Sequence, residues 1–284
     1  MKQIVMARTA GFCFGVKRAV ETVYSEIAKA TGPVFTYGPI IHNETVIRDL
    51  EEKGVRIICS EEELHKLNYG TLIIRSHGVG KNIYDICREK GLRVVDATCP
   101  FVRKIHEIVQ KENAGGRRVL IAGDPHHAEV EGIRGWGRED TAVVESAEGL
   151  EEAGLDRTGK YSLVSQTTFN LTKFQEIVDK IPKLGYDIHC YNTICSATQE
   201  RQEEAGKIAS NVDCMIVIGS RTSSNTQKLV EICAGACRNT VFIQSLDDLD
   251  PEVLRAAKSI GITAGASTPK HIIEEVQLHV GRKF

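Results

Sequence analysis

The 284-residue sequence lacks a sizeable net charge, a long apolar run and a low-complexity linker. Its 36 Lys and Arg residues face 38 Asp and Glu residues, a formal charge of −2, so attraction to nucleic acid or an anionic membrane is not expected. No apolar run reaches the roughly 18 residues that cross a bilayer. The start, MKQIVMARTAGFC, is interrupted at Arg8 and has no signal-peptide core. We therefore expect a cytoplasmic protein that binds neither nucleic acid nor a membrane.

The sequence also lacks any CxxC pair and any ferredoxin-type run of cysteines, although it contains nine cysteines. A local zinc ribbon or ferredoxin cluster is therefore not expected. An odd number of cysteines without a secretion signal argues against a disulfide framework. The nearest pair, Cys233 and Cys237, lies near the end of an expected helix, and we expect it to pack on a helix face.

What the sequence contains is an alternation of strand-like and helix-like segments. Hydrophobic residues make up 42% and charged residues 26%, which is ordinary for a chain with a packed core. Apolar strand-like runs occupy residues 34–37, 71–76, 93–96, 118–123, 161–166, 214–220, 241–244 and 260–265. Amphipathic helical patterns include residues 16–30, 102–114 and 199–210. This alternation predicts an α/β fold with largely parallel sheets.

The pattern repeats three times along the chain. Three cysteines each stand immediately before an expected helix: Cys13, Cys99 and Cys195. A strand that ends in glycine follows each of these helices, at Gly38, Gly123 and Gly219, which lie 25, 24 and 24 residues after the cysteines. Each glycine opens a polar loop that leads into another helix, and a second strand in each repeat again ends in polar residues. Three related α/β units are the simplest explanation.

These repeats predict the domain boundaries. The expected ranges are 14–98 for the first unit, 99–194 for the second, 195–268 with 1–13 for the third, and 269–284 for a C-terminal helix and tail. In parallel sheets, ligands bind beyond the carboxyl ends of strands, where the next helices begin. We therefore expect the units to be arranged with pseudo-threefold symmetry, so that the nine polar segments at their strand ends surround one central cavity.

The three cysteines suit a metal site. The positive end of a helix dipole and free backbone N–H groups favour the thiolate, which is the form that binds metal. Soft sulfur ligands select zinc, copper(I) or an iron–sulfur cluster. Three cysteines without an evident fourth ligand leave an open coordination position, which favours catalysis.

The polar loops add groups that can bind an anion or transfer protons. His42, His77 and His127 occupy equivalent loops, and Glu129 follows His127 by two residues. Hydroxyl and amide groups at other strand ends can bind phosphate: Thr167, Thr168, Ser223, Ser224, Asn225 and Ser267. The residues alone leave two other interpretations open. The Ser-Ser-Asn-Thr run could be an ordinary helix cap, and Glu129 could be a solvated or capping carboxylate.

Eight motifs together resemble one enzyme family. They are GFCFGVKRAV, HNETV, RSHGVG, DATCPFV, HHAEVEG, SQTT, GSRTSSNTQKL and AGASTP, in this order over the whole chain. This set resembles the 4-hydroxy-3-methylbut-2-enyl diphosphate reductases, which perform the last step of the non-mevalonate isoprenoid pathway. The resemblance implies a trefoil-like α/β fold around a central [4Fe–4S] cluster held by Cys13, Cys99 and Cys195. It also implies that the fourth iron binds the allylic hydroxyl group of the substrate.

The resemblance further implies a role for each residue that matches a motif. The implied substrate-binding residues are His42, His77, His127, Ser223, Ser224, Asn225 and Ser267, together with Thr167 or Thr168. The sequence does not decide between these two threonines, and we favour Thr167. Glu129 matches the proton-relay glutamate, which makes Glu129, Thr167 and His127 the expected catalytic residues. His127 is preferred over His126 because it keeps the HxE spacing to Glu129.

The implied reaction is a reductive dehydroxylation that yields isopentenyl diphosphate and dimethylallyl diphosphate. Two electrons would enter through the cluster from a donor such as ferredoxin or flavodoxin. Two other functions remain open at this point. A cluster-bearing redox sensor without turnover would explain the three cysteines, and so would a three-cysteine zinc hydrolase that acts on a phosphate ester.

Overall fold

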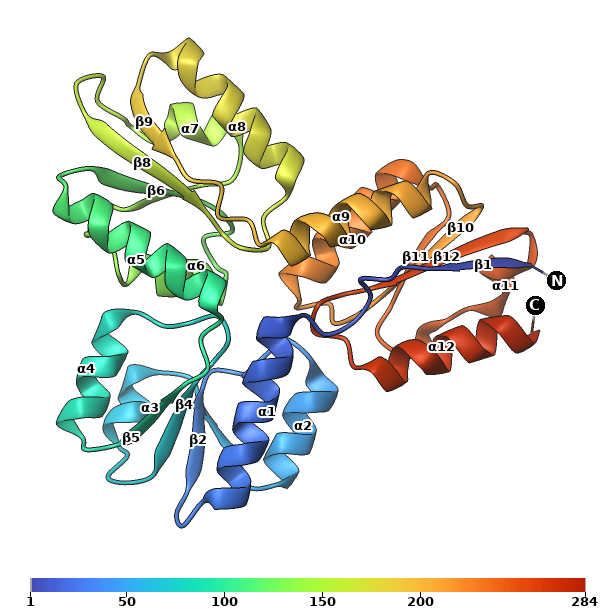
Figure 1. Cartoon of the computed structure of the whole chain (residues 1–284), viewed down its shortest axis with the longest axis horizontal. Helices are drawn as coiled ribbons and strands as arrows, with labels where there is room; N and C mark the ends of the chain where they lie inside the picture. Colours follow the sequence, from blue (N-terminus) through green and yellow to red (C-terminus); the bar gives the residue numbers. More distant parts are fainter. Residues whose placement is uncertain (1, 284) are drawn as a thin grey trace. The chain divides into compact units, whose positions relative to one another are not determined.

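The computed structural model describes residues 2–283 and contains three four-stranded parallel sheets (Figure 1). Met1 and Phe284, the outermost residues of the predicted ranges 1–13 and 269–284, lie outside the described residues. Helices alternate with strands along the chain. The predicted α/β class with parallel sheets is confirmed.

The first sheet contains β2 (Val34–Tyr37), β3 (Arg56–Ile58), β4 (Thr71–Ile74) and β5 (Arg93–Asp96). The second contains β6 (Arg118–Ala122), β7 (Ala142–Val144), β8 (Lys160–Ser165) and β9 (Asp187–Cys190). The third contains β10 (Cys214–Ile218), β11 (Thr240–Ile243), β12 (Ser259–Ala264) and β1 (Gln3–Met6).

The three sheets share one strand order. The orders are β3-β2-β4-β5, β7-β6-β8-β9 and β11-β10-β12-β1, so the third sheet takes its fourth strand from the beginning of the chain. Strand β1 pairs in parallel with β12, and Gln3 lies opposite Ser259. The sequence repeat therefore corresponds to a structural repeat, with β1 in the position that β5 and β9 hold elsewhere.

Helices connect the strands and cover the sheets. Those before β6 are α1 (Phe14–Lys29), α2 (Glu44–Glu52), α3 (Glu61–His65), α4 (Lys81–Glu89) and α5 (Pro100–Ala114). Next come α6 (Ala128–Arg134), α7 (Ala147–Glu152), α8 (Leu171–Leu184) and α9 (Ser196–Ala209). The last are α10 (Ser224–Ala236), the short 3₁₀ helix η1 (Leu246–Asp248), α11 (Pro251–Arg255) and α12 (Lys270–Lys283). None of the described helices is long and apolar enough to cross a membrane.

The contacts divide the described chain into two compact units. The terminal unit comprises residues of 1–16, 42–44 and 195–284, and the central unit comprises 17–41 and 45–194. The third sheet belongs to the terminal unit, and the first and second sheets belong to the central unit.

In the core of the terminal unit, successive residues of strand β10 pack on opposite faces of the sheet. On β10, Ile216 and Ile218 pack with α12, whereas Met215 and Val217 pack with α9 and α10 (Figure 1). Because successive side chains of a strand point to opposite faces, a strand covered on both faces is apolar throughout. All five residues of β10 are buried.

Within the central unit, two glycines allow the segments before α4 and after α6 to touch. A Cβ atom on Gly135 would lie 2.4 Å from the Cα atom of Gly80, which leaves no room for a side chain. Next to this contact, the indole nitrogen of Trp136 donates a hydrogen bond to the Val79 carbonyl oxygen at 2.8 Å. The backbone approach fixes the loop that starts at the end of β4 against the loop region around α6.

Candidate active site

The three cysteines of the repeat occupy equivalent positions. Each follows the fourth strand of its sheet and precedes a helix: Cys13 before α1, Cys99 before α5 and Cys195 before α9. Cys99 and Cys195 are the N-cap residues of their helices, and neither side chain accepts a capping hydrogen bond. All three are partly buried, and no disulfide joins any of the nine cysteines.

The other six cysteines lie in different environments. Four are buried: Cys87, Cys214, Cys233 and Cys237. Burial raises the pKa of the Cys233 thiol to about 12, so it stays protonated at neutral pH. Cys59 and Cys190 are exposed and do not start helices. As expected, Cys233 and Cys237 pack in the core beside α9.

Backbone hydrogen bonds join two of the cysteines to neighbouring polar loops. In the central unit, the Cys99 N–H donates to the carbonyl oxygen of Ser76 at 2.9 Å, and Ser76 precedes His77. In the terminal unit, the Cys13 N–H donates to the carbonyl oxygen of Ala266 at 3.2 Å, directly before Ser267. The repeat therefore places a cysteine beside a strand-end loop in the same way in both units.

A buried acid lies in the central unit, at the carboxyl ends of β6 and β8. Glu129 is only 2% exposed. Its Oε1 atom accepts a hydrogen bond from the Thr167 N–H at 2.6 Å, and its Oε2 atom accepts one from the Thr167 hydroxyl group at 2.7 Å. One threonine therefore binds both carboxylate oxygens.

Burial sets the acidity of this carboxyl group. Loss of hydration raises the pKa of Glu129 to about 7 from its ordinary value of 4.5, although the two hydrogen bonds from Thr167 act in the opposite direction. A general acid is most effective when its pKa lies near the working pH. Glu129 can therefore hold a proton and release it at neutral pH.

The neighbouring threonine has a different partner. The Thr168 hydroxyl oxygen accepts a hydrogen bond from the Gln166 side-chain amide at 2.8 Å. The Gln166 side-chain oxygen in turn accepts from the Asp124 N–H at 3.1 Å, which joins the loops after β6 and β8. The two hydrogen bonds to the buried acid come from Thr167. The sequence motif contained Gln166, but nothing in its spacing indicated this linking position.

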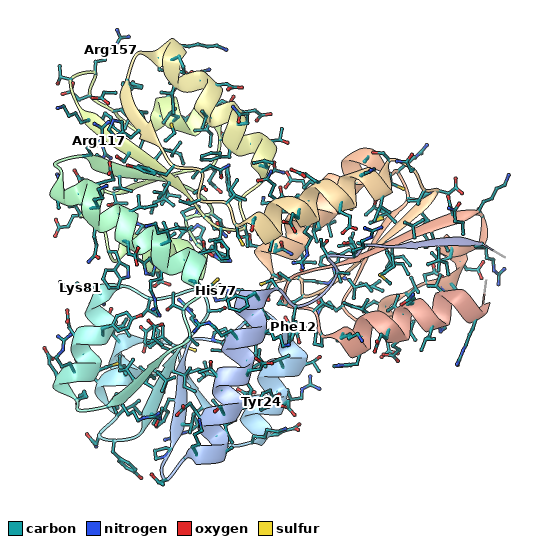
Figure 2. The ribbon with its side chains drawn as sticks, in the orientation of Figure 1. Phe12, Tyr24, His77, Lys81, Arg117 and Arg157 are labelled. Carbon is teal, nitrogen blue, oxygen red and sulfur yellow. The ribbon has the colours of Figure 1, made fainter. Side chains whose placement is uncertain are left out.

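His127 and His77 lie close together in the central unit. Their ring centroids are 5.5 Å apart, and the rings are nearly perpendicular; Figure 2 shows His77 on the loop after β4. His127 is the N-cap of α6, and its Nδ1 atom accepts the Glu129 N–H at 3.1 Å. Nδ1 therefore carries no proton, and Nε2 is the nitrogen that can donate. His126, by contrast, is exposed.

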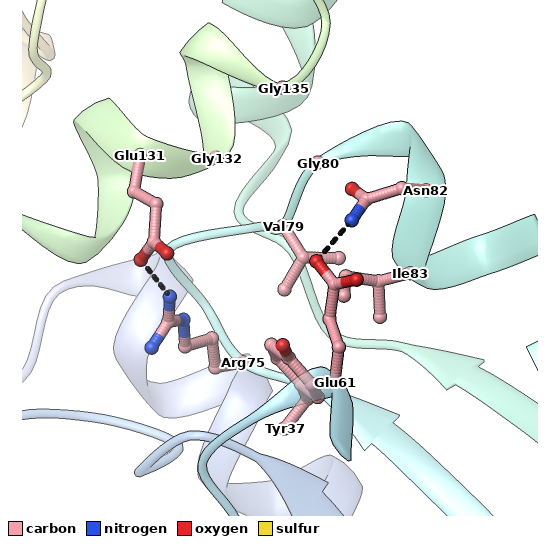
Figure 3. A pocket seen from close by; sticks show the side chains of 10 residues that line it. All are labelled: Tyr37, Glu61, Arg75, Val79, Gly80, Asn82, Ile83, Glu131, Gly132 and Gly135. Atoms are coloured by element: carbon pink, nitrogen blue, oxygen red, sulfur yellow. Dashed lines mark hydrogen bonds and ion pairs between the residues drawn. The ribbon is translucent and has the colours of Figure 1, made fainter. Parts of the chain in front are cut away.

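Glu131 differs from Glu129 although it is only two residues away. Its side chain is 79% exposed and lies 3.5 Å from the Arg75 guanidinium group. These two residues line a small cavity of about 200 Å³ together with Tyr37 and Glu61 (Figure 3). The two carboxylates of HHAEVEG therefore serve different surroundings, and only Glu129 contacts Thr167.

The terminal unit contains a group of hydroxyl and amide side chains at the carboxyl ends of β10 and β12. Ser223 caps α10, and its hydroxyl oxygen accepts the Thr226 N–H. The Ser267 hydroxyl group donates to the His42 carbonyl oxygen at 2.9 Å and lies 3.4 Å from the Ser223 hydroxyl group.

Asn225 completes this group. It is 4% exposed, and its side-chain nitrogen has no hydrogen-bond partner among the described residues. Ser224, the first residue of α10, is partly buried. A buried amide donor at the start of a helix is suited to an anionic ligand, because the free N–H groups and the helix dipole favour negative charge there.

One contact in the terminal unit was not predictable from the sequence motifs. Glu44 accepts a hydrogen bond from the Ser220 hydroxyl group at 2.8 Å, which ties the beginning of α2 to the loop after β10. Glu44 belongs to the HNETV motif, directly after the histidine loop. Its acidic side chain resembled an ordinary first-turn residue of a helix.

Together, the buried acid, the hydroxyl groups and the helix-start cysteines at strand ends define an α/β enzyme. The family model described as LytB protein matches residues 4–280. A 4-hydroxy-3-methylbut-2-enyl diphosphate reductase of Caldanaerobacter subterraneus subsp. tengcongensis is 46% identical over 96% of this chain and 95% of the relative. The enzyme of the same name from Clostridioides difficile is 44% identical over 96% of this chain and 97% of the relative.

Solved structures agree with these relatives. A structure of the E-1-hydroxy-2-methyl-but-2-enyl-4-diphosphate reductase from Plasmodium falciparum is 31% identical, with a TM-score of 0.92 over 98% of this chain and 87% of that one. A structure of an (E)-4-hydroxy-3-methyl-but-2-enyl diphosphate reductase is 40% identical, with a TM-score of 0.70 over 99% and 100% of the chains. The chain belongs to the LytB protein family. The predicted family and the prediction of an oxidoreductase are confirmed.

Proposed function

We propose that this protein reduces 4-hydroxy-3-methylbut-2-enyl diphosphate to isopentenyl diphosphate and dimethylallyl diphosphate. The family and its named relatives support the substrate. The single observation in the structure that supports the chemistry best is the buried Glu129 carboxyl group with the Thr167 hydroxyl group 2.7 Å away. The reaction consumes two electrons and two protons, breaks the allylic C–O bond and releases water.

We propose that Cys13, Cys99 and Cys195 hold a [4Fe–4S] cluster. The donor set fits, because these three cysteines stand at helix starts, are partly buried and form no disulfide. When bound, the cluster would pass the electrons of the donor one at a time and would offer one iron that these three cysteines leave without a protein ligand. A one-electron protein such as ferredoxin or flavodoxin is the proposed donor.

The residues of the chain manage the protons. Glu129, with a pKa of about 7, is the proposed source of the proton that lets the hydroxyl oxygen leave as water. Thr167 keeps the carboxyl group in one orientation through its two hydrogen bonds. His127 offers its Nε2 as a donor, because Nδ1 is occupied by the Glu129 N–H.

We propose that the diphosphate binds to His42, His77, His127, Ser223, Ser224, Asn225 and Ser267. In the terminal unit, a group of polar side chains at one sheet end supports this diphosphate site, and the group includes the buried Asn225 amide. Ser267 and Ser223 hydroxyl groups lie within 3.4 Å of each other, close enough to bind one phosphate group. A hydrogen bond to a charged group contributes about 1.5–3 kcal/mol.

The decisive experiment is turnover under anaerobic conditions. The purified protein is given the allylic diphosphate and a one-electron reductant, and both five-carbon diphosphate products are measured together with protein-bound iron and labile sulfide. We expect both products and about four iron and four sulfide per chain. Zinc without labile sulfide would favour a hydrolase, and a cluster without turnover would favour a redox sensor.

A matched pair of variants tests the diphosphate site. Asn225→Asp replaces a buried amide donor by a carboxylate of the same shape, and it repels phosphate. We expect KM to rise about 10- to 100-fold with the cluster intact. Asn211→Asp, at an exposed position of the same unit, is the control and is expected to leave KM unchanged. An unchanged KM in Asn225→Asp would remove this residue from the site.

A further inference from the structure

Helix α9 binds the loop before Cys13 through two side chains that lie one turn apart. The Glu204 carboxylate accepts the Arg8 N–H and the Thr9 N–H, both at 2.9 Å, and the Thr9 hydroxyl group at 2.7 Å. Arg201 Nε donates to the Thr9 carbonyl oxygen at 2.9 Å, and Nη2 donates to the Thr9 and Gly11 carbonyl oxygens, the latter at 2.8 Å. One face of helix α9 thus binds both backbone N–H groups and backbone carbonyl groups of this loop.

This contact connects two of the proposed cluster ligands within the terminal unit. Helix α9 starts directly after Cys195, and the bound loop ends at Cys13. Arg201 stands between them, six residues after Cys195 on the helix, and it binds a carbonyl two residues before Cys13. Arg201 therefore links the loop that leads to Cys13 with the helix that starts after Cys195.

Arg201 is also a buried charge. It is 4% exposed, and its Nη1 atom has no hydrogen-bond partner among residues 2–283. The hydrogen bonds of its guanidinium group go to the backbone carbonyl oxygens of Thr9 and Gly11. Burial lowers the pKa of Arg201, and negative charge on Cys13, Cys195 and Glu204 raises it. A buried cation without a paired carboxylate is costly unless another negative group lies nearby.

We propose that Arg201 is a positioning residue that fixes Cys13 relative to Cys195 and supplies a positive charge that favours the reduced cluster. The inference rests on the proposed function, because it takes these cysteines as cluster ligands. Reduction adds one negative charge to the cluster, and a fixed buried cation lowers the energy of the more negative state. Hydrogen bonds, charge and burial around a cluster are the features that set its potential.

The first measurement is the midpoint potential of the cluster in the anaerobic holoprotein, followed by electron paramagnetic resonance. In Arg201→Gln, we expect the equilibrium constant for one-electron reduction to fall at least tenfold, which lowers the potential by 59 mV or more. Arg201→Lys keeps the charge and is expected to change the constant less than threefold. Arg8→Gln removes a positive charge from the same loop at an exposed, solvent-screened position, and is expected to leave the potential unchanged.

The second measurement is amide hydrogen exchange of residues 9–13, with and without cluster. Both Arg201 variants lose hydrogen bonds to the loop carbonyls, so we expect faster exchange there than in the parent protein. A potential in Arg201→Gln equal to that of the parent overturns the electrostatic role, and unchanged exchange overturns the positioning role. If Arg201→Gln does not fold, Arg201→Lys is used to test the proposal. A parental cluster potential with faster amide exchange of residues 9–13 supports it, and unchanged amide exchange overturns it.

The two measurements separate this inference from the proposed function. A protein without iron and labile sulfide would refute the proposed cluster, whereas loop exchange in that protein would still report on Arg201. Conversely, a loaded and active Arg201→Gln enzyme with parental potential and exchange would refute the inference and leave the proposed function in place.

Discussion

Replacing Glu129 with Gln is expected to stabilise the protein while it removes activity. The amide has the same shape as the carboxyl group and can accept the Thr167 N–H and donate to the Thr167 hydroxyl oxygen, so both contacts survive. The substitution removes the free-energy cost of burying an ionised carboxylate at a residue that is 2% exposed. The substitution also removes the proton that the Glu129 carboxyl group is proposed to transfer.

The pKa gives the size and the sign of the stability change. The pKa of Glu129 is raised in the folded protein from 4.5 to about 7. Its contribution to stability is therefore fully present below pH 4.5 and is lost as the pH rises through 7. Relative to its value below pH 4.5, the free energy of unfolding is lower by about 3 kcal/mol at pH 8.5 and by less than about 1 kcal/mol at pH 5. Each pKa unit corresponds to about 1.4 kcal/mol. Glu129→Gln does not pay this cost.

The assay is urea denaturation of the anaerobic protein at pH 8.5 and pH 5, combined with steady-state kinetics. We expect Glu129→Gln to exceed the parent by about 3 kcal/mol only at pH 8.5, and kcat to fall by about 10²- to 10⁴-fold. In the parent, kcat/KM is expected to fall as the pH rises through about 7.

The exposed Glu131 provides the control for these measurements. Glu131→Gln is expected to stay within about 0.5 kcal/mol of the parent at both pH values and to keep most of its activity. Equal stability of Glu129→Gln and the parent at pH 8.5 would refute the raised pKa. A near-normal kcat with full cluster content would refute the proton-donor role.

Three further outcomes are expected. The Cys99→Ser variant is expected to lose most of its protein-bound iron and sulfide. The Cys233→Ser variant, changed at a buried core position, is expected to keep both. Full cluster content in Cys99→Ser would contradict the ligand assignment. The Thr167→Val variant is expected to lower kcat by at least about tenfold, because the Glu129 carboxyl group loses a hydroxyl partner. The Thr168→Val variant is expected to lower kcat less. A larger decrease in Thr168→Val would assign the role of Thr167 to Thr168. Activity in air declines within hours, because an iron with an open position is readily oxidised, and undiminished activity would contradict the open site.

The central strands of the fold were predictable, and several edge strands were not. The strands β2, β4, β6, β8, β10 and β12 lie inside their sheets and form apolar runs in the sequence. Strands β1, β3, β7 and β9 were not among the predicted runs, and all four are sheet edges of three or four residues. Short, partly exposed strands have no continuous apolar pattern, and only pairing with a neighbour defines them.

The candidate site shows a similar limit. The motif SQTT offered two threonines, and only the hydrogen bonds to Glu129 distinguish Thr167 from Thr168. Arg201 lies in the polar sequence QERQEE, which is typical of an exposed helix, yet it is 4% exposed. Its burial depends on a loop almost 200 residues away in the chain, and local patterns contain no such information.

The pairing of β1 with β12 has a consequence for how the protein matures during synthesis. Ser259, the partner of Gln3, is made 256 residues after it. At about 5–20 residues per second, β1 is without its partner strand for on the order of 10 to 50 s. The first two sheets can form within that interval, because all their strands precede residue 191. Cys13 can therefore reach its native surroundings only after β12 and Ala266 have been made, whereas the strands before and beside Cys99 are complete earlier.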